Sequence, residues 1–471
     1  MKFKKLLFMA MLAAVVGFTG NVVTAQTSPT PFETDVNSAI NDGLQYLRDN
    51  SAFTSSSAGY RKTRGLNLLA LLEKRANANT NAATNGYANS TIADQGLAED
   101  AVTRIISDTT YGVSRGNFYA YSDGMNMMAL SLYGMTGGPD IASADYTVRE
   151  SIDRLVDRAI AAQLDTGFWW YHVSGEGANQ NDSSTTQFVV AGLSAAKGFY
   201  EETGSDPGNR LFLINATLQK CSGKAGGEGY ANHESFGPTI NGTALTGGAS
   251  YTYSSNNDYG RWKESSYQQT ASGLWCELLG GFGLNETAVQ NKLGWLYTMY
   301  NYNSTDAAYG PSGWRIAYFY YLWSSSKAYS LIEKSVATPS GSNLTTTDLG
   351  TLANSSGFPR LLHRIPASDT RPAPRGAGAA PYYNAEPQSW YYDYAYRLME
   401  LQSSGRFVNP SGTPSSEADH AYALLVLQRA LGGVCNTDSD GDGICDDLDL
   451  CPDNATAEFS DDDGDGVGNL C

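Results

Sequence analysis

Apolar residues recur at helical spacing through most of this chain. The apolar side chains of Val36, Ile40, Leu44 and Leu47 fall on one helical face. From Leu66 to Leu72, by contrast, nearly every position is apolar. The first pattern predicts a helix lying against a core, and the second predicts a helix buried on all sides. The same pairing returns along the chain. We predict helix pairs at about 36–47 with 62–76, 96–108 with 123–135, 147–163 with 182–200, 207–221 with 264–280, 285–299 with 311–334, and 387–403 with 414–431.

Consecutive helix pairs without convincing alternating strand segments indicate an all-α repeat architecture. The second helix of each pair is the more apolar, which predicts an inner ring of second helices wrapped by the first ones. An open solenoid is the alternative. Asp182 is a candidate N-cap, because a short carboxylate accepts hydrogen bonds from free backbone amides. Thr413 is a candidate cap as well, and Pro311 and Pro414 fit the first turns of their helices.

The third pair resembles a known repeat. Gln163, Gly167-Phe168-Trp169 and Asp182-Ser183-Ser184-Thr185-Thr186-Gln187-Phe188 are similar to the repeat of squalene cyclases and protein prenyltransferases. Weaker matches are Gly116-Asn117-Phe118, Tyr267-Gln268-Gln269-Thr270-Ala271, and Gln402 with Gly405-Arg406-Phe407. The resemblance covers about 35–432 and implies an (α/α)6 toroid, with its domain at 26–434 and an insertion at 335–386.

The resemblance does not extend to the chemistry of those families. The cyclases use an acidic DxDD motif, and the only similar run, Asp461-Asp462-Asp463, lies in the C-terminal tail. The prenyltransferases bind zinc through Asp-x-Cys, whereas neither Cys221 nor Cys276 has an Asp two positions earlier. We therefore transfer the fold and not the activity.

Candidate functional residues lie in the loops between the first and second helix of each pair. An alternating double ring places loops 109–122, 164–181, 222–263, 300–310 and 404–413 on one face. Aromatic residues there suit stacking on sugar rings, and paired carboxylates suit acid and base work on a glycosidic bond. The aromatic candidates are Trp170, Tyr171, Tyr253 and Trp262; the carboxylate pairs are Asp165 with Glu176 and Glu234 with Asp258; His172 and His233 complete the set.

Each candidate also has a structural interpretation. Aromatic residues at repeat positions, Phe168 and Trp169 above all, pack helices together. Acidic loop residues are mostly solvated, and the histidines show no metal-ligand spacing. The sequence alone does not choose between these interpretations.

The first 25 residues predict export. Lys2, Lys4 and Lys5 precede an apolar run from Leu6 to Phe18, and Val23-Thr24-Ala25 fits a signal-peptidase site. The run is shorter than the ~20 residues that span a bilayer, so a retained anchor is the weaker alternative. Six cysteines in an exported chain suggest disulfides, and Cys221 with Cys276 is either a pair or two buried thiols. We expect a secreted or cell-surface protein without a later membrane span.

Segment 435–471 has the pattern of a calcium-binding tail. Alternate carboxylates can converge on one cation where a glycine permits the sharp turn. The predicted Ca2+ ligands are Asp438, Asp440, Asp442, Asp446 and Asp449 in a first loop and Asp461, Asp463 and Asp465 in a second. The segment resembles thrombospondin type 3 repeats, and the resemblance implies disulfides joining Cys451 to Cys471 and Cys435 to Cys445. The second loop lacks the distal ligands because the sequence stops at Cys471.

The net charge is -17, to which the tail contributes twelve acidic residues and no basic one. So acidic a surface disfavours nucleic acid as a partner. The leading hypothesis is a secreted calcium-binding protein whose toroid binds or processes an extracellular polymer, most simply carbohydrate. The alternatives are a non-enzymatic surface or matrix adhesion module and, less favoured, an isoprenoid cyclase or transferase.

Overall fold

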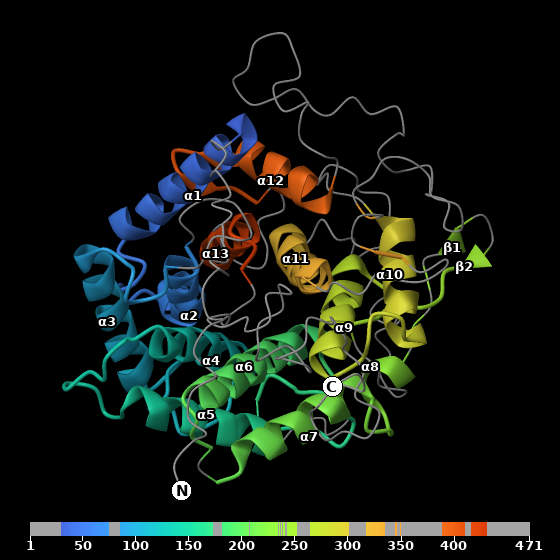
Figure 1. The fold of residues 1–471 in the computed structure, drawn as a ribbon, viewed down its shortest axis with the longest axis horizontal. Coiled ribbons are helices and arrows are strands. Elements are labelled where there is room, and N and C mark those ends of the chain that lie inside the picture. Colours follow the sequence, from blue (N-terminus) through green and yellow to red (C-terminus); the bar gives the residue numbers. More distant parts are fainter. Residues whose placement is uncertain are drawn as a thin grey trace, which may run out of the picture.

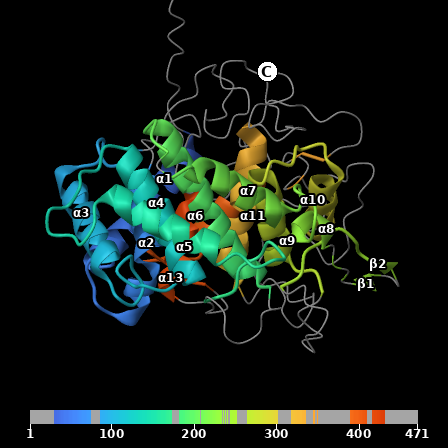
Figure 2. The ribbon, with the colours of Figure 1, turned by 90° about the horizontal axis from the view of Figure 1, so that it is seen from below.

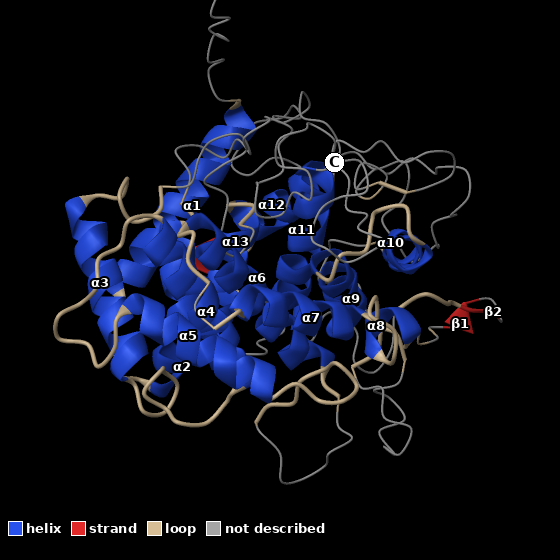
Figure 3. Cartoon of the chain, turned by 60° about the horizontal axis from the view of Figure 1, so that its bottom comes forward, coloured by secondary structure: helices blue, strands red, loops and turns tan. Residues whose placement is uncertain are grey.

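The structure is a computed structural model in which helices dominate. They make up 63% of the described residues, which confirms the prediction of an all-α chain. Figure 3 shows the same preponderance, with two-residue strands as the only sheet structure drawn. The described residues are 30–74, 85–172, 181–206, 208–233, 235, 237, 239–240, 243–251, 264–300, 317–334, 344–345, 349, 389–409 and 416–430.

The helices follow the predicted pairs closely. The first helices are α1 (Pro31–Asp49), α3 (Ile92–Ser107), α5 (Val148–Ala161), α7 (Arg210–Ser222), α10 (Thr287–Met299) and α12 (Trp390–Glu400). The second helices are α2 (Ala58–Leu72), α4 (Ala120–Met135), α6 (Ser183–Glu202), α9 (Tyr267–Leu279), α11 (Tyr318–Lys334) and α13 (Ser416–Leu427). Figure 1 shows the second helices near the centre and the first helices around them. The predicted first-turn prolines Pro311 and Pro414, and the cap Thr413, lie outside the described residues.

Short elements interrupt two of the loops. Between α7 and α9 lie the one-turn helix α8 (Gly229–Asn232) and the antiparallel strands β1 (Thr239–Ile240) and β2 (Thr243–Ala244). Figure 2 shows that β1 and β2 stand apart from the helices at one edge of the molecule. Strands β3 (Gln402–Ser403) and β4 (Arg406–Phe407) form a hairpin after α12. These strands are too short to have been detected as alternating segments.

Contacts between second helices run in a cycle. Helix α2 contacts α4, α4 contacts α6, and the series continues through α9, α11 and α13 back to α2. The second helices are accordingly buried nearly all round, and in α6 every residue from Ser183 to Leu193 is buried. The first helices bury one face, as in α1, where Val36, Ile40 and Leu44 point inward. This difference is the one that the apolar pattern predicted.

The glutamines that follow α5 and α12, Gln163 and Gln402, join one first helix to the next. Gln163 Nε2 donates to the Gly167 carbonyl in its own turn and to the Thr217 carbonyl of α7, both at 2.9 Å. Gln402 Nε2 does the same in the last repeat, reaching Gly405 at 3.3 Å and the Ala39 carbonyl of α1 at 2.7 Å. The last repeat therefore bonds the first one with the contact that joins interior repeats.

The glycines of the same motif are required by the backbone. Gly167 has φ +88° and Gly405 has φ +77°, backbone angles that residues with a Cβ rarely adopt. A Cβ on Gly167 would also lie 2.6 Å from the Lys220 carbonyl oxygen of α7. The glutamine and the glycine thus belong to one tight turn that holds neighbouring first helices together.

Candidate functional site

Three loops on one face of the ring are joined by backbone hydrogen bonds. The Ala120 amide donates to the Tyr171 carbonyl at 3.0 Å, and Tyr119 and His172 form an isolated antiparallel bridge. The Ser183 amide in turn donates to the Tyr251 carbonyl at 3.1 Å. The segments that precede α4, α6 and α9 therefore lie side by side, as expected for loops on one face.

Asp182 stands at the centre of these joined loops. Its carboxylate caps α6 as predicted, because Oδ1 accepts from the amides of Ser184 at 2.7 Å and Thr185 at 3.0 Å. Ser184 Oγ donates to the same oxygen at 2.5 Å. The side chain is fully buried, and the hydroxyls of Tyr251 and Tyr171 lie close enough to interact with its carboxyl group. Burial raises the pKa of Asp182 above its usual range, against the lowering effect of Ser184 and of nearby Tyr251 and Tyr171.

Tyrosine hydroxyls surround this carboxyl group. Tyr171 Oη and Tyr251 Oη lie 2.7 Å apart, Tyr121 Oη lies 2.7 Å from Ser184 Oγ, and Tyr320 Oη donates to the Ser184 carbonyl at 3.3 Å. Burial, followed by the charge of Asp182, raises the pKa of Tyr171 to about 12. The phenols are therefore protonated at neutral pH. We call Asp182, Tyr121, Tyr171, Tyr251 and Ser184 the acid cluster.

The acid cluster combines a buried acid with donors and aromatic faces. A carboxyl group with a raised pKa keeps its proton at higher pH and can act as a general acid. Phenol groups next to it can bind the hydroxyls of a ligand while their rings contact its apolar faces. This combination suits a polyhydroxylated ligand.

Aromatic rings of the second helices pack together next to the acid cluster, where Phe188 contacts Tyr121. Phe188 of α6 stacks on Trp323 of α11 with 4.9 Å between ring centroids, and Trp323 lies 5.1 Å from Tyr422 of α13. Trp275 of α9 meets Trp323 edge to face at 5.8 Å. Rings from four second helices thus touch one another across the ring, which indicates a packed core at this level rather than a large chamber.

The predicted loop residues have different fates. Asp165 is exposed in the turn after α5, whereas Trp170 and Tyr171 are half-buried and meet edge to face at 5.0 Å. His172 is exposed and stacks on Tyr119, while His233 lies 3.5 Å from the Glu228 carboxylate. Of these residues, the structure brings Tyr171 into the acid cluster.

Other candidates lie outside the described residues. They comprise Glu176, Glu234, Tyr253, Asp258, Trp262, all of the predicted calcium ligands, and the four tail cysteines.

Phe168 and Trp169 have the structural role that the repeat position suggests. Both are fully buried, and Trp169 Nε1 donates to the Ala159 carbonyl of α5 at 2.7 Å. The Trp169 amide donates to Thr186 Oγ1 of α6 at 3.0 Å. In the last repeat the Phe407 amide donates to His420 Nδ1 at 3.1 Å, so His420 takes the place of the threonine. Burial lowers the pKa of His420 to about 4, which keeps this imidazole neutral.

Sequence reasoning identified Asp182 as a cap but not as the centre of a cluster. Tyr121 falls within the predicted loop 109–122. In the structure it lies in the first turn of α4, where its hydroxyl contacts Ser184 Oγ. The available signal was the run of hydroxyl residues after Asp182 on a helix predicted to be buried. Buried polar side chains need partners, and such a run indicates that polar groups from elsewhere meet it.

Cys221 and Cys276 are buried, separate thiols on α7 and α9. Burial, and then contact with Cys221, raises the pKa of the Cys276 thiol well above its usual range. The structure therefore favours the second interpretation, two buried thiols, and places the two thiols next to each other.

Comparison with known proteins adds no relative: no family model, curated protein or solved structure matches this chain. Within the described ranges, no helix has the length and apolar character needed to cross a membrane. The same ranges contain no group of three or more His, Cys, Asp or Glu residues placed to hold a metal ion.

Proposed function

We propose that this chain is an exported protein whose helical hairpins close into a toroid, and that the loop face of the toroid binds or processes an extracellular carbohydrate polymer. Ring closure is supported by the cycle of second-helix contacts and by the Gln402 bond to α1. The acid cluster carries the functional part of the proposal. A fully buried carboxyl set among phenols is costly to desolvate and is explained by a ligand that uses it.

Two further features belong to the proposal. Half-buried Trp170 and Tyr171 supply aromatic surface beside the acid cluster. The tail 435–471 binds Ca2+ through its aspartates and serves as a stiffened C-terminal segment, because bound calcium and disulfides can replace a hydrophobic core. Secretion or display at the cell surface follows from the signal-peptide pattern.

A purely adhesive module is the second candidate. Glycoside hydrolysis ordinarily uses two carboxyl groups, and within the described residues Asp182 has no second carboxylate in contact. If none of the loops supplies a second carboxylate, the acid cluster binds a carbohydrate without cleaving it. An isoprenoid cyclase or transferase is less favoured, because aromatic side chains pack the centre of the ring.

The decisive experiment uses the mature full-length chain with neutral and acidic polysaccharides, with and without calcium. Retention is followed by affinity electrophoresis and product release by reducing-end or unsaturated-sugar assays. Asp182→Asn preserves the Oδ1 acceptor of the helix cap and removes the acid. If Asp182 is a general acid, this variant loses product formation by about 10²–10⁴-fold while retention changes little.

Asp94→Asn is the matched control, because Asp94 is buried on α3, where it pairs with Arg48 at 2.8 Å away from the acid cluster. Its product formation should equal that of the wild type. Retention without products, unchanged in Asp182→Asn, would favour the adhesive module. Failure to retain any polysaccharide would refute carbohydrate as the ligand.

A further inference from the structure

A row of cations and aromatic rings borders the acid cluster. Lys62 Nζ lies 5.6 Å from the ring centroid of Tyr111, and the Tyr111 and Tyr119 centroids are 6.4 Å apart. The Arg115 guanidinium lies 5.1 Å from the Tyr119 centroid, and His172 stacks on the Tyr119 ring with 4.9 Å between ring centroids. We call Lys62, Tyr111, Arg115, Tyr119 and His172 the cationic rim.

The cationic rim is continuous with the acid cluster. Tyr119 meets Tyr121 edge to face with 6.1 Å between centroids, and Tyr121 meets Tyr171 at 5.7 Å. Tyr121 Oη in turn contacts Ser184 Oγ, which donates to Asp182. A ligand chain that occupies the acid cluster could therefore continue over the rim.

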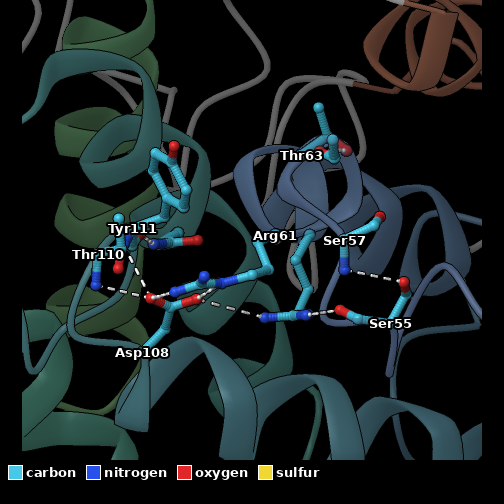
Figure 4. Close-up of polar contacts among 10 residues, drawn as sticks. Ser55, Ser57, Arg61, Thr63, Asp108, Thr110 and Tyr111 are labelled. Atoms are coloured by element: carbon cyan, nitrogen blue, oxygen red, sulfur yellow. Dashed lines mark hydrogen bonds and ion pairs between the residues drawn. The ribbon is translucent and has the colours of Figure 1, made fainter.

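Nearby carboxylates are already neutralised by other arginines. Arg61 donates to both oxygens of Asp108, at 2.7 and 2.8 Å, and Arg64 lies 3.9 Å from the same carboxylate. Figure 4 shows Arg61 directed at Asp108, beside Thr110 and Tyr111. Although burial opposes it, bonds from Arg61 and from two backbone amides lower the pKa of Asp108, so it stays ionised and paired.

A second carboxylate, Asp123, is also paired. Arg158 Nη2 lies 3.0 Å from Asp123 Oδ1. Asp108 and Asp123 therefore form their ion pairs with Arg61 and Arg158, although the charge of Arg115 also acts on Asp123.

Arg115 contacts a backbone carbonyl and an imidazole. Arg115 donates to the Thr110 carbonyl at 3.3 Å, and its Nη2 lies 3.1 Å from His172 Nδ1. Neither Arg115 nor Lys62 has a carboxylate within ion-pair distance among the residues that the structure describes. Lys62 and His172 are exposed. Cations without an ion-pair partner among the described residues, on a chain with net charge -17, mark a place where negative charge is expected from outside.

We propose that the cationic rim binds an acidic polysaccharide, a polymer of sugars bearing carboxylate or sulfate groups. Sugar rings stack on Tyr111 and Tyr119, and their anionic substituents pair with Lys62 and Arg115. One cation beside each of the two tyrosine rings fits a polymer in which each sugar ring carries one charge. The inference rests on the proposed carbohydrate function, and it restricts the proposed ligands to polysaccharides that carry acidic groups.

The test compares charged and neutral forms of the same polymers. Affinity electrophoresis of the full chain is run with polygalacturonate, alginate and chondroitin sulfate, and with methyl-esterified polygalacturonate and desulfated chondroitin methyl ester as neutral counterparts. A calcium chelator is present throughout, so that calcium cannot bridge the acidic tail to the polymer. At least one acidic polymer should bind about tenfold or more tightly than its neutral form, and its binding should weaken as salt rises from low to moderate concentration.

The variants Lys62→Gln and Arg115→Gln should each weaken binding of the acidic polymer by about fivefold or more, and their salt dependence should become shallower. Arg149→Gln is the matched control. This arginine also covers an aromatic ring, with 4.8 Å to the centroid of Phe199, but it lies at the start of α5, away from the loop that leads to α6. It should bind as the wild type does.

Several outcomes would overturn the inference. Equal binding of charged and neutral polymers, sensitive to Asp182→Asn, would leave the proposed function intact and refute the acidic ligand. Binding that neither rim substitution weakens would place the acidic polymer elsewhere. Stronger binding of single-stranded DNA, lost in the same variants, would reassign the rim to nucleic acid. Retention of no polysaccharide at all would refute the proposed function together with the inference.

Discussion

Lys327 offers a direct test of the packed core. Its side chain is fully buried on α11, where Nζ lies 4.8 Å from the ring centroid of Trp275 and 5.0 Å from that of Trp323. Within the described residues the amine has no hydrogen-bond partner. Burial lowers its pKa from 10.5 to about 7, against the opposing effect of Glu73. We predict that Lys327→Met stabilises the fold at acidic and neutral pH.

The magnitude follows from proton linkage. Above pH 10.5 the amine is neutral in both states, so its titration contributes nothing to the free energy of unfolding. Between pH 10.5 and 7 the unfolded chain binds a proton that the folded chain does not, so stability falls as the pH falls. Below pH 7 the cost is complete, at about 5 kcal/mol for a pKa lowered by about 3.5 units. Losing the interaction of the cation with two indoles removes about 2 kcal/mol, so the net gain at pH 6 is about 3 kcal/mol.

Urea unfolding of the full chain, followed by tryptophan fluorescence at pH 6, 8 and 10 with a calcium chelator, measures this difference. The advantage of Lys327→Met should shrink to below about 1 kcal/mol at pH 10. Lys292→Met is the contrasting control, because Lys292 Nζ lies 2.5 Å from the buried carboxylate of Glu277. Its loss strands that carboxylate and should destabilise by about 3–5 kcal/mol. Destabilisation by Lys327→Met at pH 6, or an effect independent of pH, would refute the reasoning.

Three other predictions concern packing, cysteines and calcium. Gly124→Ala places a Cβ 2.2 Å from a backbone carbonyl oxygen of α6 and should lower the melting temperature strongly, whereas Gly96→Ala, which meets no atom within 4 Å, should raise stability by about 0.5–1 kcal/mol. Peptide mapping of the purified chain, alkylated under denaturing conditions without reductant, should recover Cys221 and Cys276 as two alkylated thiols, because both are free and buried in the structure; one disulfide-linked pair would contradict this. Calorimetry should detect calcium binding that Asp440→Ala weakens at least tenfold without changing urea unfolding of the helices; absence of binding heat in the wild type would refute the calcium prediction.

Helix positions could be predicted because their causes are local. The periodicity of Val36, Ile40 and Leu44 defines one face of α1, and Asp182 caps α6 with amides two and three residues away. Boundaries shifted by a few residues where caps were weak, as at α7, which starts after Asn209 in a left-handed conformation. Such shifts do not alter which face of a helix is buried.

The candidate site was less predictable because its members come from different loops. Nothing near Asp182 in the chain shows that Tyr121 and Tyr251 join it, and nothing near Arg115 shows that it faces Tyr119 and His172. The paired loop carboxylates proposed from the sequence relied on proximity along the chain. Asp165 proved to be exposed, and the acid at the centre of the described cluster is a helix cap.

The sequence by itself determined the all-α character of the chain, the pairing of an amphipathic helix with a buried one, and the cap at Asp182. These depend on apolar spacing and on backbone amides within one helical turn. Only the tertiary structure decided that Gln402 bonds the first helix, that Lys327 lies between two indoles, and that the Asp182 carboxyl is buried among phenols. Burial and long-range contacts set pKa values and binding surfaces, and they exist only once distant segments have packed together.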